Sequence, residues 1–267
     1  KDEHGKVSVT SADQSLGKCE RTFIDHIRCI TTGTSSWPIA VISGLAPFKV
    51  AIEDVMDLMW GRTNMRLVKD WLISSTTSFA MKCIGNSLCF RSIEVVLLEA
   101  KKQVGTSSFS GITELFAGVG TGAEAAALVF PGEQVKFLGE INLALQSLLH
   151  TRYPDATIVG DLSEEKNRSL IPPTGFLLVV TFPCQPNSIR NHAPEGRGVA
   201  RRRQDGLVLL KLLLEPLLRN GGYEVIVLEN VFGMLRVHGD DGVSPYADLT
   251  AWLNKLGVKY NKFVVVD

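Results

Sequence analysis

The sequence is poor in cysteine, has no excess of either charge and contains no long apolar run. Its cysteines are odd in number and form no Cys-x-x-Cys pair, which argues against a disulfide framework and a zinc site and favours a reducing, intracellular compartment. Lys and Arg number 28 and are balanced by 28 Asp and Glu, so any nucleic-acid surface has to be local. No apolar run is long enough to cross a bilayer and Lys1–Glu3 does not resemble a signal peptide, so we expect no membrane partner. The five cysteines are Cys19, Cys29, Cys83, Cys89 and Cys184.

A length of 267 residues with 45% hydrophobic content fits one large α/β domain, or such a domain with a small appendage. Residues 1–20 are polar and aperiodic, which predicts a loose arm. Ile52–Trp60 and Ser92–Lys102 have apolar residues at helical spacing. The polar stretch Gly105–Gly111 predicts a linker, with residues 112–267 forming the main domain.

After the linker, strand-like and helix-like patterns alternate. The segment Phe176–Phe182 is continuously apolar, as in a parallel strand that is buried on both faces. The alternation predicts an α/β fold with a doubly wound, mostly parallel sheet, whose ligands bind beyond the carboxyl ends of the strands. The predicted strands are Ile112–Phe116, Val135–Leu138, Thr157–Val159, Phe176–Phe182, Val225–Leu228 and Lys262–Val266. The predicted helices are Gly122–Val129, Leu143–His150, Gly206–Leu218 and Tyr246–Leu256.

Residues that suit a nucleotide-like ligand follow the first three strands. The turn Phe116–Gly122 is rich in glycine, which permits a tight turn and close approach of a ligand to the backbone. Glu140 is placed to accept hydrogen bonds from ribose hydroxyls, and Asp161 from an adenine amino group. Each acid alone is more consistent with a helix cap or a solvated charge, so the prediction depends on the recurrence of suitable residues after three consecutive strands.

The motifs at the strand ends resemble those of the DNA cytosine-C5 methyltransferase family in order and spacing, over about residues 111–267. They are LFAGVGTG at Leu115–Gly122, the acid Glu140, GDL at 160–162, FPCQP at 182–186 and ENV at 229–231. The resemblance implies the Rossmann-like sheet of the class I methyltransferases and S-adenosyl-L-methionine as the cofactor. The cofactor-binding residues it implies are Phe116, Ala117, Gly118, Gly120, Thr121, Gly122, Glu140, Ile141, Asp161, Leu162, Pro183, Asn86 and Ser87.

Methylation of cytosine C5 explains why this site needs a cysteine. The ring becomes nucleophilic at C5 when a thiolate adds to C6, and a carboxylic acid at N3 relieves the charge that develops. The resemblance implies Cys184 as the nucleophile and Glu229 as the N3 partner, whose pKa burial would raise. Asn230 is expected to order the loop that carries Cys184. A buried inert thiol is the alternative interpretation of Cys184.

The segment after Cys184 is strongly basic, and Gly196 and Gly198 lead us to expect a mobile loop. In the family this segment closes over duplex DNA around a flipped cytosine, so the expected partner is duplex DNA. A solvated basic loop is the alternative. The implied DNA-binding residues are Gln185, Ser188, Arg190, Arg197, Arg201, Arg202 and Arg203.

The first hundred residues suggest a circular permutation. Ile84–Ser87 and the helix to Lys102 resemble the family's last motif, and Arg28–Thr32 with Ile52–Trp60 resembles what precedes it in de novo-type enzymes. Residues 21–104 would then be a remnant of the target-recognition region plus that motif, as in the domains-rearranged methyltransferases.

Departures from the family pattern keep other functions open. A Gln-x-Arg-x-Arg motif is absent, Asn187 replaces an aromatic residue, and Glu114 or Thr113 stands where an Asp opens the first motif. An absent segment in cis or a partner chain is therefore expected to complete the sheet, since only Val7–Thr10 resembles a replacement strand. The alternatives are a non-catalytic regulatory subunit and an RNA cytosine methyltransferase, which Phe182 before Pro183 disfavours. The expected location is the nucleus in a eukaryote, and otherwise the cytoplasm or nucleoid.

Overall fold

The computed structural model of the chain describes residues 8–11, 38–41, 48–49, 51–61, 65–105, 108–184, 199–220, 222–237 and 242–259. These residues belong to two compact units, Lys1–Val95 and Val96–Val266. The division falls inside one helix, whereas the predicted linker Gly105–Gly111 follows that helix. The segments Arg28–Thr32 and Lys262–Val266 lie outside the described residues.

The first unit combines a small sheet with helices. Within the predicted arm, residues 8–11 form a strand of an antiparallel sheet of order β1-β2-β3, so residues 8–10 of the expected replacement strand belong to this sheet and not to the parallel one. Of the helices, α1 and α4 match the predicted spacing, and two short ones between them were not predicted. The elements are β1 (Ser8–Ser11), β2 (Pro38–Val41), β3 (Phe48–Lys49), α1 (Ile52–Trp60), α2 (Arg66–Ile73), α3 (Thr77–Gly85) and α4 (Phe90–Gln103), which continues into the second unit.

The second unit confirms the predicted fold class. Its five strands are all parallel and have the order β6-β5-β4-β7-β8, so the chain moves outward from β4 first in one direction and then in the other. This order is that of a doubly wound, Rossmann-like sheet. The strands are β4 (Ile112–Leu115), β5 (Val135–Gly139), β6 (Thr157–Val159), β7 (Gly175–Thr181) and β8 (Tyr223–Glu229).

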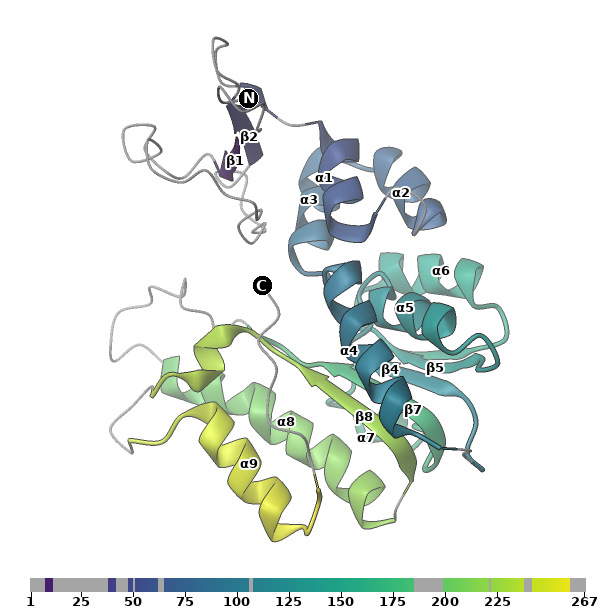
Figure 1. The fold of residues 1–267 in the computed structure, drawn as a ribbon, viewed down its shortest axis with the longest axis vertical. Helices are drawn as coiled ribbons and strands as arrows, with labels where there is room; N and C mark the ends of the chain where they lie inside the picture. The colour runs from purple at the N-terminus through teal and green to yellow at the C-terminus, as the bar shows by residue number, and fades with distance from the viewer. Residues whose placement is uncertain are drawn as a thin grey trace. The chain divides into compact units, whose positions relative to one another are not determined.

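Helices cover both faces of this sheet, as Figure 1 shows. On one face, sheet residues such as Phe137 and Val180 pack in one apolar cluster with leucines of α8 and α9. On the other face, Leu138 packs with Ala123 and Leu149 from α5 and α6. Neighbouring residues on one strand face opposite ways, which explains why the strands read as continuous apolar runs. The helices are α5 (Thr121–Val129), α6 (Leu143–Arg152), α7 (Glu165–Arg168), α8 (Val199–Arg219), the short 3₁₀ helix η4 (Phe232–Leu235) and α9 (Pro245–Lys255).

Helix α8 corrects two sequence-based expectations. It begins at Val199, whereas we predicted a mobile loop up to Arg203 and a helix only from Gly206. Gly206 suggested a boundary because glycine weakens a helix, but the preceding residues include good helix formers that extend it by two turns. Pro216 lies inside the helix, which continues to Arg219.

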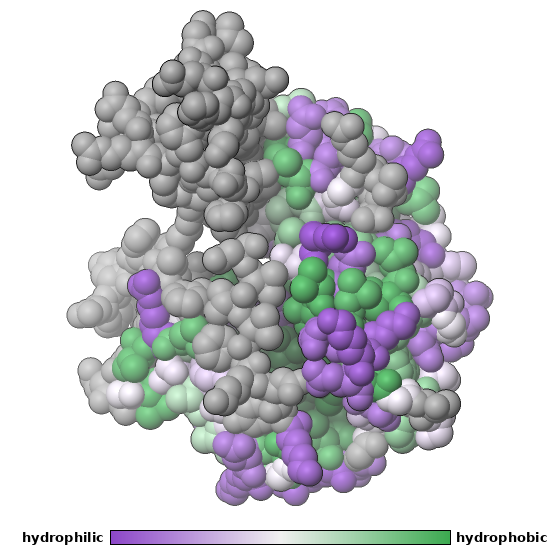
Figure 2. Space-filling view, in the orientation of Figure 1, coloured by the Kyte–Doolittle hydropathy of each residue, from purple (hydrophilic) through white to green (hydrophobic). Residues whose placement is uncertain are grey.

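The exposed surface carries apolar side chains that lie between hydrophilic ones. Leu98 on α4 and Leu128 on α5 are about half exposed. On the face drawn in Figure 2, the hydrophobic areas of the described residues are interrupted by hydrophilic side chains. Among the described helices, none combines the length and apolar character that crossing a bilayer requires.

Candidate functional site

The glycine-rich turn between β4 and α5 has the backbone of a close-approach site. Gly118 and Gly120 have φ values of 56° and 78°, in the left-handed region that favours glycine, and Phe116 has a φ of 62°. The N–H of Gly120 donates to the carbonyl oxygen of Ala117 at 2.7 Å. A Cβ added at Gly118 would meet no atom of the described residues within 4 Å. A ligand therefore has room to approach this backbone.

Glu114 holds the start of α5 from beneath the turn. Its buried carboxylate accepts hydrogen bonds from the N–H groups of Gly122 at 3.0 Å and Ala123 at 2.8 Å. A Cβ on Gly122 would lie 2.5 Å from Glu114 Oε1, so glycine is needed there for the two to meet. Burial raises the pKa of Glu114 to about 7, against the lowering effect of these N–H groups and of Arg152.

We did not predict this role for Glu114. The signal was present, because a carboxylate inside an apolar strand has to find a buried partner. Of Glu114 and Thr113, the two residues at the position where the family has an Asp, it is Glu114 whose side chain contacts the start of α5.

Glu140 connects the turn to the next helix. One carboxylate oxygen accepts the Gly118 N–H at 2.8 Å, and the other accepts the Asn142 N–H at 2.8 Å. Each carboxylate oxygen has two lone pairs, so the pair retains capacity for a diol such as that of a ribose. Ile141 follows with 66% of its surface exposed, which leaves an apolar face open at the carboxyl end of β5.

The residues after β6 divide between ligand-facing and core positions. Asp161 is half-buried, and its Oδ1 accepts the Ser163 N–H at 2.8 Å. Leu162 is only 3% exposed and packs against Gly139, so its side chain belongs to the core and only its backbone can face a ligand. Thr121, at the start of α5, has a buried hydroxyl without a hydrogen-bond partner among the described residues. A buried polar group of this kind suits a ligand that satisfies it.

The ends of β7 and β8 carry the predicted catalytic residues. The strands pair in parallel, with Thr181 opposite Glu229. The segment that carries Cys184 therefore begins at the same edge of the sheet as Glu229. Asn230 Nδ2 donates to the carbonyl oxygen of Phe182 at 2.9 Å, the contact expected of a residue that orders the Cys184 segment. Burial raises the pKa of Glu229 to about 7, as we expected of a buried N3 partner. Cys184 is a half-buried thiol.

Hydrogen bonds join the carboxyl ends of all five strands into one continuous edge. The Glu140 N–H donates to the carbonyl oxygen of Val159, the last residue of β6. The Ala117 N–H donates to the carbonyl oxygen of Gly139, the last residue of β5. The Thr181 hydroxyl then donates to Phe116 O at 2.9 Å, which connects β7 to the turn. The glycine-rich turn and the Pro183–Cys184 segment therefore lie on one edge of the sheet.

The other predicted residues lie in α8, in the first unit or outside the described residues. Arg201, Arg202 and Arg203 lie in the first turns of α8, where only the backbone is described, and Gln185, Ser188, Arg190 and Arg197 lie outside the described residues. Asn86 ends α3, and Ser87 Oγ accepts a hydrogen bond from the Trp60 indole at 3.1 Å. Asn86 and Ser87 thus belong to the first unit, within which Ser87 joins α3 to α1.

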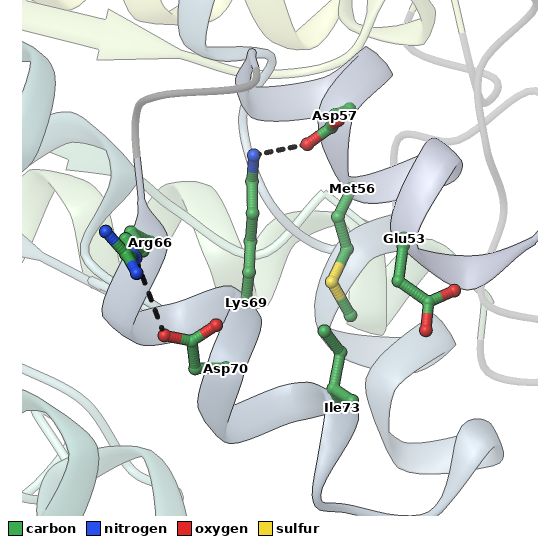
Figure 3. A pocket seen from close by; sticks show the side chains of 7 residues that line it. All are labelled: Glu53, Met56, Asp57, Arg66, Lys69, Asp70 and Ile73. Carbon is green, nitrogen blue, oxygen red and sulfur yellow. Dashed lines mark hydrogen bonds and ion pairs between the residues drawn. The ribbon is translucent and has the colours of Figure 1, made fainter.

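A separate hollow of about 450 Å³ lies between α1 and α2 (Figure 3). Four of its five charged side chains form two pairs: Lys69 Nζ lies 2.5 Å from Asp57 Oδ1, and Arg66 lies 3.9 Å from Asp70, whereas Glu53 belongs to neither pair. This pairing joins the two helices and does not favour a ligand of one charge. None of its lining residues was predicted to bind a ligand. They are Glu53, Met56, Asp57, Arg66, Lys69, Asp70 and Ile73.

Comparison with known proteins yields no family model that matches the chain and no matching curated protein. Among solved structures, the chain is similar to DesVI of Streptomyces venezuelae, with 16% identity and a TM-score of 0.34 over 53% of this chain and 51% of that one. It is also similar to the mitomycin 7-O-methyltransferase MmcR, with 12% identity and a TM-score of 0.36 over 71% of this chain and 48% of that one. The chain thus spans about half the length of each. At these TM-scores function has to be argued from the residues themselves.

Proposed function

We propose that this chain is an S-adenosyl-L-methionine-dependent methyltransferase that acts on C5 of cytosine in DNA, with Cys184 as its nucleophile. The observation that carries the proposal is the pairing of β7 with β8, which brings the Pro183–Cys184 segment and Glu229–Asn230 to one sheet edge. The same edge holds the glycine-rich turn, through the hydrogen bond from Thr181 to Phe116. A cofactor turn and a Cys–Glu pair are what this reaction requires.

The residues around the turn fit S-adenosyl-L-methionine. Gly118 leaves open space, Glu140 retains lone pairs for a ribose, and exposed Ile141 offers an apolar face for an adenine. Asp161 has a half-buried carboxylate that suits an exocyclic amino group. When bound, this cofactor supplies a methyl group made electrophilic by its sulfonium.

In the proposed reaction Cys184 and Glu229 act on the cytosine ring. The Cys184 thiolate forms a bond to C6, which displaces the electron pair of the C5–C6 double bond toward N3. N3 takes the proton of Glu229, so the ring does not carry the negative charge. C5 then uses its own electron pair to form a bond to the methyl group, and the bond between that methyl group and the sulfonium sulfur breaks with its electron pair remaining on sulfur, so that S-adenosyl-L-homocysteine leaves. The C5 proton leaves to solvent, the C5–C6 double bond forms again, and the bond between C6 and the sulfur of Cys184 breaks. Glu229 recovers its proton from N3, and Cys184 is regenerated.

The start of α8 supports DNA as the substrate. A Cβ on Gly206 would lie 3.0 Å from the carbonyl oxygen of Pro183, so the helix approaches the Cys184 segment closely. Arg202 precedes Gly206 by one helical turn. The three consecutive arginines therefore lie in the first turns of a helix that approaches the segment of the proposed nucleophile, and arginine is a residue type that contacts phosphates.

The test is covalent capture on duplex DNA that contains 5-fluorocytosine, in the presence of S-adenosyl-L-methionine. Fluorine at C5 blocks the final elimination, so we expect a denaturant-resistant adduct that Cys184→Ser abolishes and Cys89→Ser, at another half-buried thiol, preserves. An adduct that survives Cys184→Ser would assign the nucleophile elsewhere. DNA binding without any adduct in the parent chain would favour a regulatory subunit, and an adduct only with 5-fluorocytosine RNA would favour an RNA substrate.

A further inference from the structure

Arg152, the last residue of α6, is a buried cation that the proposed reaction does not use. Its side chain is only 4% exposed. Nη1 donates a hydrogen bond to the carbonyl oxygen of Val119, inside the glycine-rich turn. Nη2 donates to Glu124 Oε2 at 2.8 Å and to the Tyr153 hydroxyl at 3.1 Å. The guanidinium therefore joins the turn to the helix that follows it.

Tyr153 closes this arrangement and keeps the guanidinium in place. Its hydroxyl donates to the same Glu124 oxygen at 3.2 Å, and Arg152 Cζ lies 4.9 Å from its ring centre. Burial raises the pKa of Tyr153 above its usual range, so the phenol remains a donor. A Cβ on Gly120 would lie 2.9 Å from Arg152 Nη1 and 2.9 Å from Leu149 Cδ2, so the turn has no space to shift toward α6.

The peptide unit between Val119 and Gly120 is held at both ends. Its C=O accepts from Arg152, and its N–H donates to the carbonyl oxygen of Ala117 at 2.7 Å. The peptide unit is planar, so two such contacts determine its orientation. Glu140 holds the N–H of Gly118 on the other side of Val119. Burial of the Arg152 guanidinium costs desolvation energy, and its partner Glu124 is 38% exposed, so the geometry that this pair imposes requires an explanation other than stability.

We propose that Arg152 is a positioning residue for the cofactor: through Val119 it sets the shape of the turn on which S-adenosyl-L-methionine rests. This inference rests on the proposed function. According to this inference, Arg152 at the end of α6 affects the affinity for the cofactor indirectly, through its hydrogen bond to Val119 in the turn.

The experiment compares Arg152→Met and Arg152→Lys with Arg219→Met as the matched control, since Arg219 pairs with Glu215 on the exposed side of α8. Lys keeps the charge but cannot bond Val119 and Glu124 with one planar fork. Calorimetry with S-adenosyl-L-methionine should show an affinity loss of about tenfold or more for Met and a smaller loss for Lys. Amide hydrogen exchange without cofactor should accelerate at Gly120 in both variants, at a temperature where each is folded.

Unchanged affinity together with unchanged exchange at Gly120, whatever the fall in melting temperature, would reduce Arg152 to a structural residue and overturn the proposal. If Arg152→Met does not fold, the Lys variant decides by the same two measurements. If the parent chain does not bind S-adenosyl-L-methionine, the proposed function fails by itself. Exchange at Gly120 still reports then whether Arg152 shapes the turn: acceleration supports its positioning role, and none overturns it.

Discussion

Asn230 donates a hydrogen bond from Nδ2 to the carbonyl oxygen of Phe182 at 2.9 Å, across the ends of β8 and β7. Its Oδ1 accepts the N–H of Val231 at 3.0 Å, so both ends of the side-chain amide are in use and its orientation is determined. Phe182 stands two residues before Cys184, and Asn230 directly follows Glu229. The Asn230 side chain therefore connects the segment of the proposed nucleophile, Cys184, to the strand end that carries the proposed acid, Glu229.

Replacing Asn230 should slow the chemistry more than it weakens cofactor binding. In Asn230→Asp a carboxylate oxygen replaces the donor and faces the Phe182 carbonyl, which should lower the rate of adduct formation about tenfold to a hundredfold. The measurement is single-turnover capture of 5-fluorocytosine DNA at saturating cofactor. Calorimetry on the same variant should give a nearly unchanged affinity for S-adenosyl-L-methionine. An unchanged rate of capture would show that Asn230 does not position Cys184.

Glu229 should make stability and activity depend on pH in the same direction. Its pKa in the folded protein is about 7, above the ordinary 4.5, so the folded state holds this proton more tightly than the unfolded chain. The free energy of unfolding should fall as pH rises through this range, and Glu229→Gln should remove up to about 3 kcal/mol of that fall. Methyl transfer should decline above about pH 7, where Glu229 loses the proton that it would donate to N3 of the cytosine.

Denaturant unfolding at several pH values measures this effect. Glu224→Gln, at an exposed position on the same strand, is the matched control and should follow the parent. Parallel pH profiles for the parent and Glu229→Gln would contradict the raised pKa.

Glu140 should govern affinity for the cofactor. Glu140→Ala removes the proposed ribose acceptor and the contacts to Gly118 and Asn142, so binding of S-adenosyl-L-methionine should weaken about tenfold to a hundredfold. Glu140→Gln keeps one acceptor oxygen and should lose less. Calorimetry decides, with exposed Glu165→Gln as the control. Parent-like affinity in a folded Glu140→Ala would remove this residue from the site.

Gly122→Ala should destabilise the fold through Glu114. The new methyl would lie 2.5 Å from Glu114 Oε1 and 2.9 Å from Val179 Cγ1, both in the buried core. Overpacking of this kind costs about 1–3 kcal/mol, visible as a lower midpoint in denaturant. Gly132→Ala is the matched control, because a Cβ there meets no atom of the described residues within 4 Å. Equal denaturation midpoints for the two variants would show that the Glu114 carboxylate can move away from the new methyl group at little cost in stability.

The strands and the site edge were predictable because they depend on local patterns. A continuous apolar run such as Phe176–Phe182 indicates a strand buried on both faces, and β7 occupies Gly175–Thr181. Parallel strands place their carboxyl ends together, so the motifs at those ends point to one site. The short helices α2 and α3 were missed, although α1, which has the same nine residues in length as α3, was predicted from its apolar spacing.

The sequence by itself determined the alternation of strands and longer helices in the second unit, and the Cys and Glu at the ends of two neighbouring strands. Only the tertiary structure decided what these residues meet: that Glu114 turns toward Gly122, that Arg152 reaches Val119, and that Glu229 stands opposite Thr181. Arg152 and Val119 are 33 positions apart along the chain, and the pKa of Glu229 depends on burial by the folded chain. Local sequence sets backbone propensity, whereas desolvation and hydrogen bonding between distant segments exist only once the chain has packed.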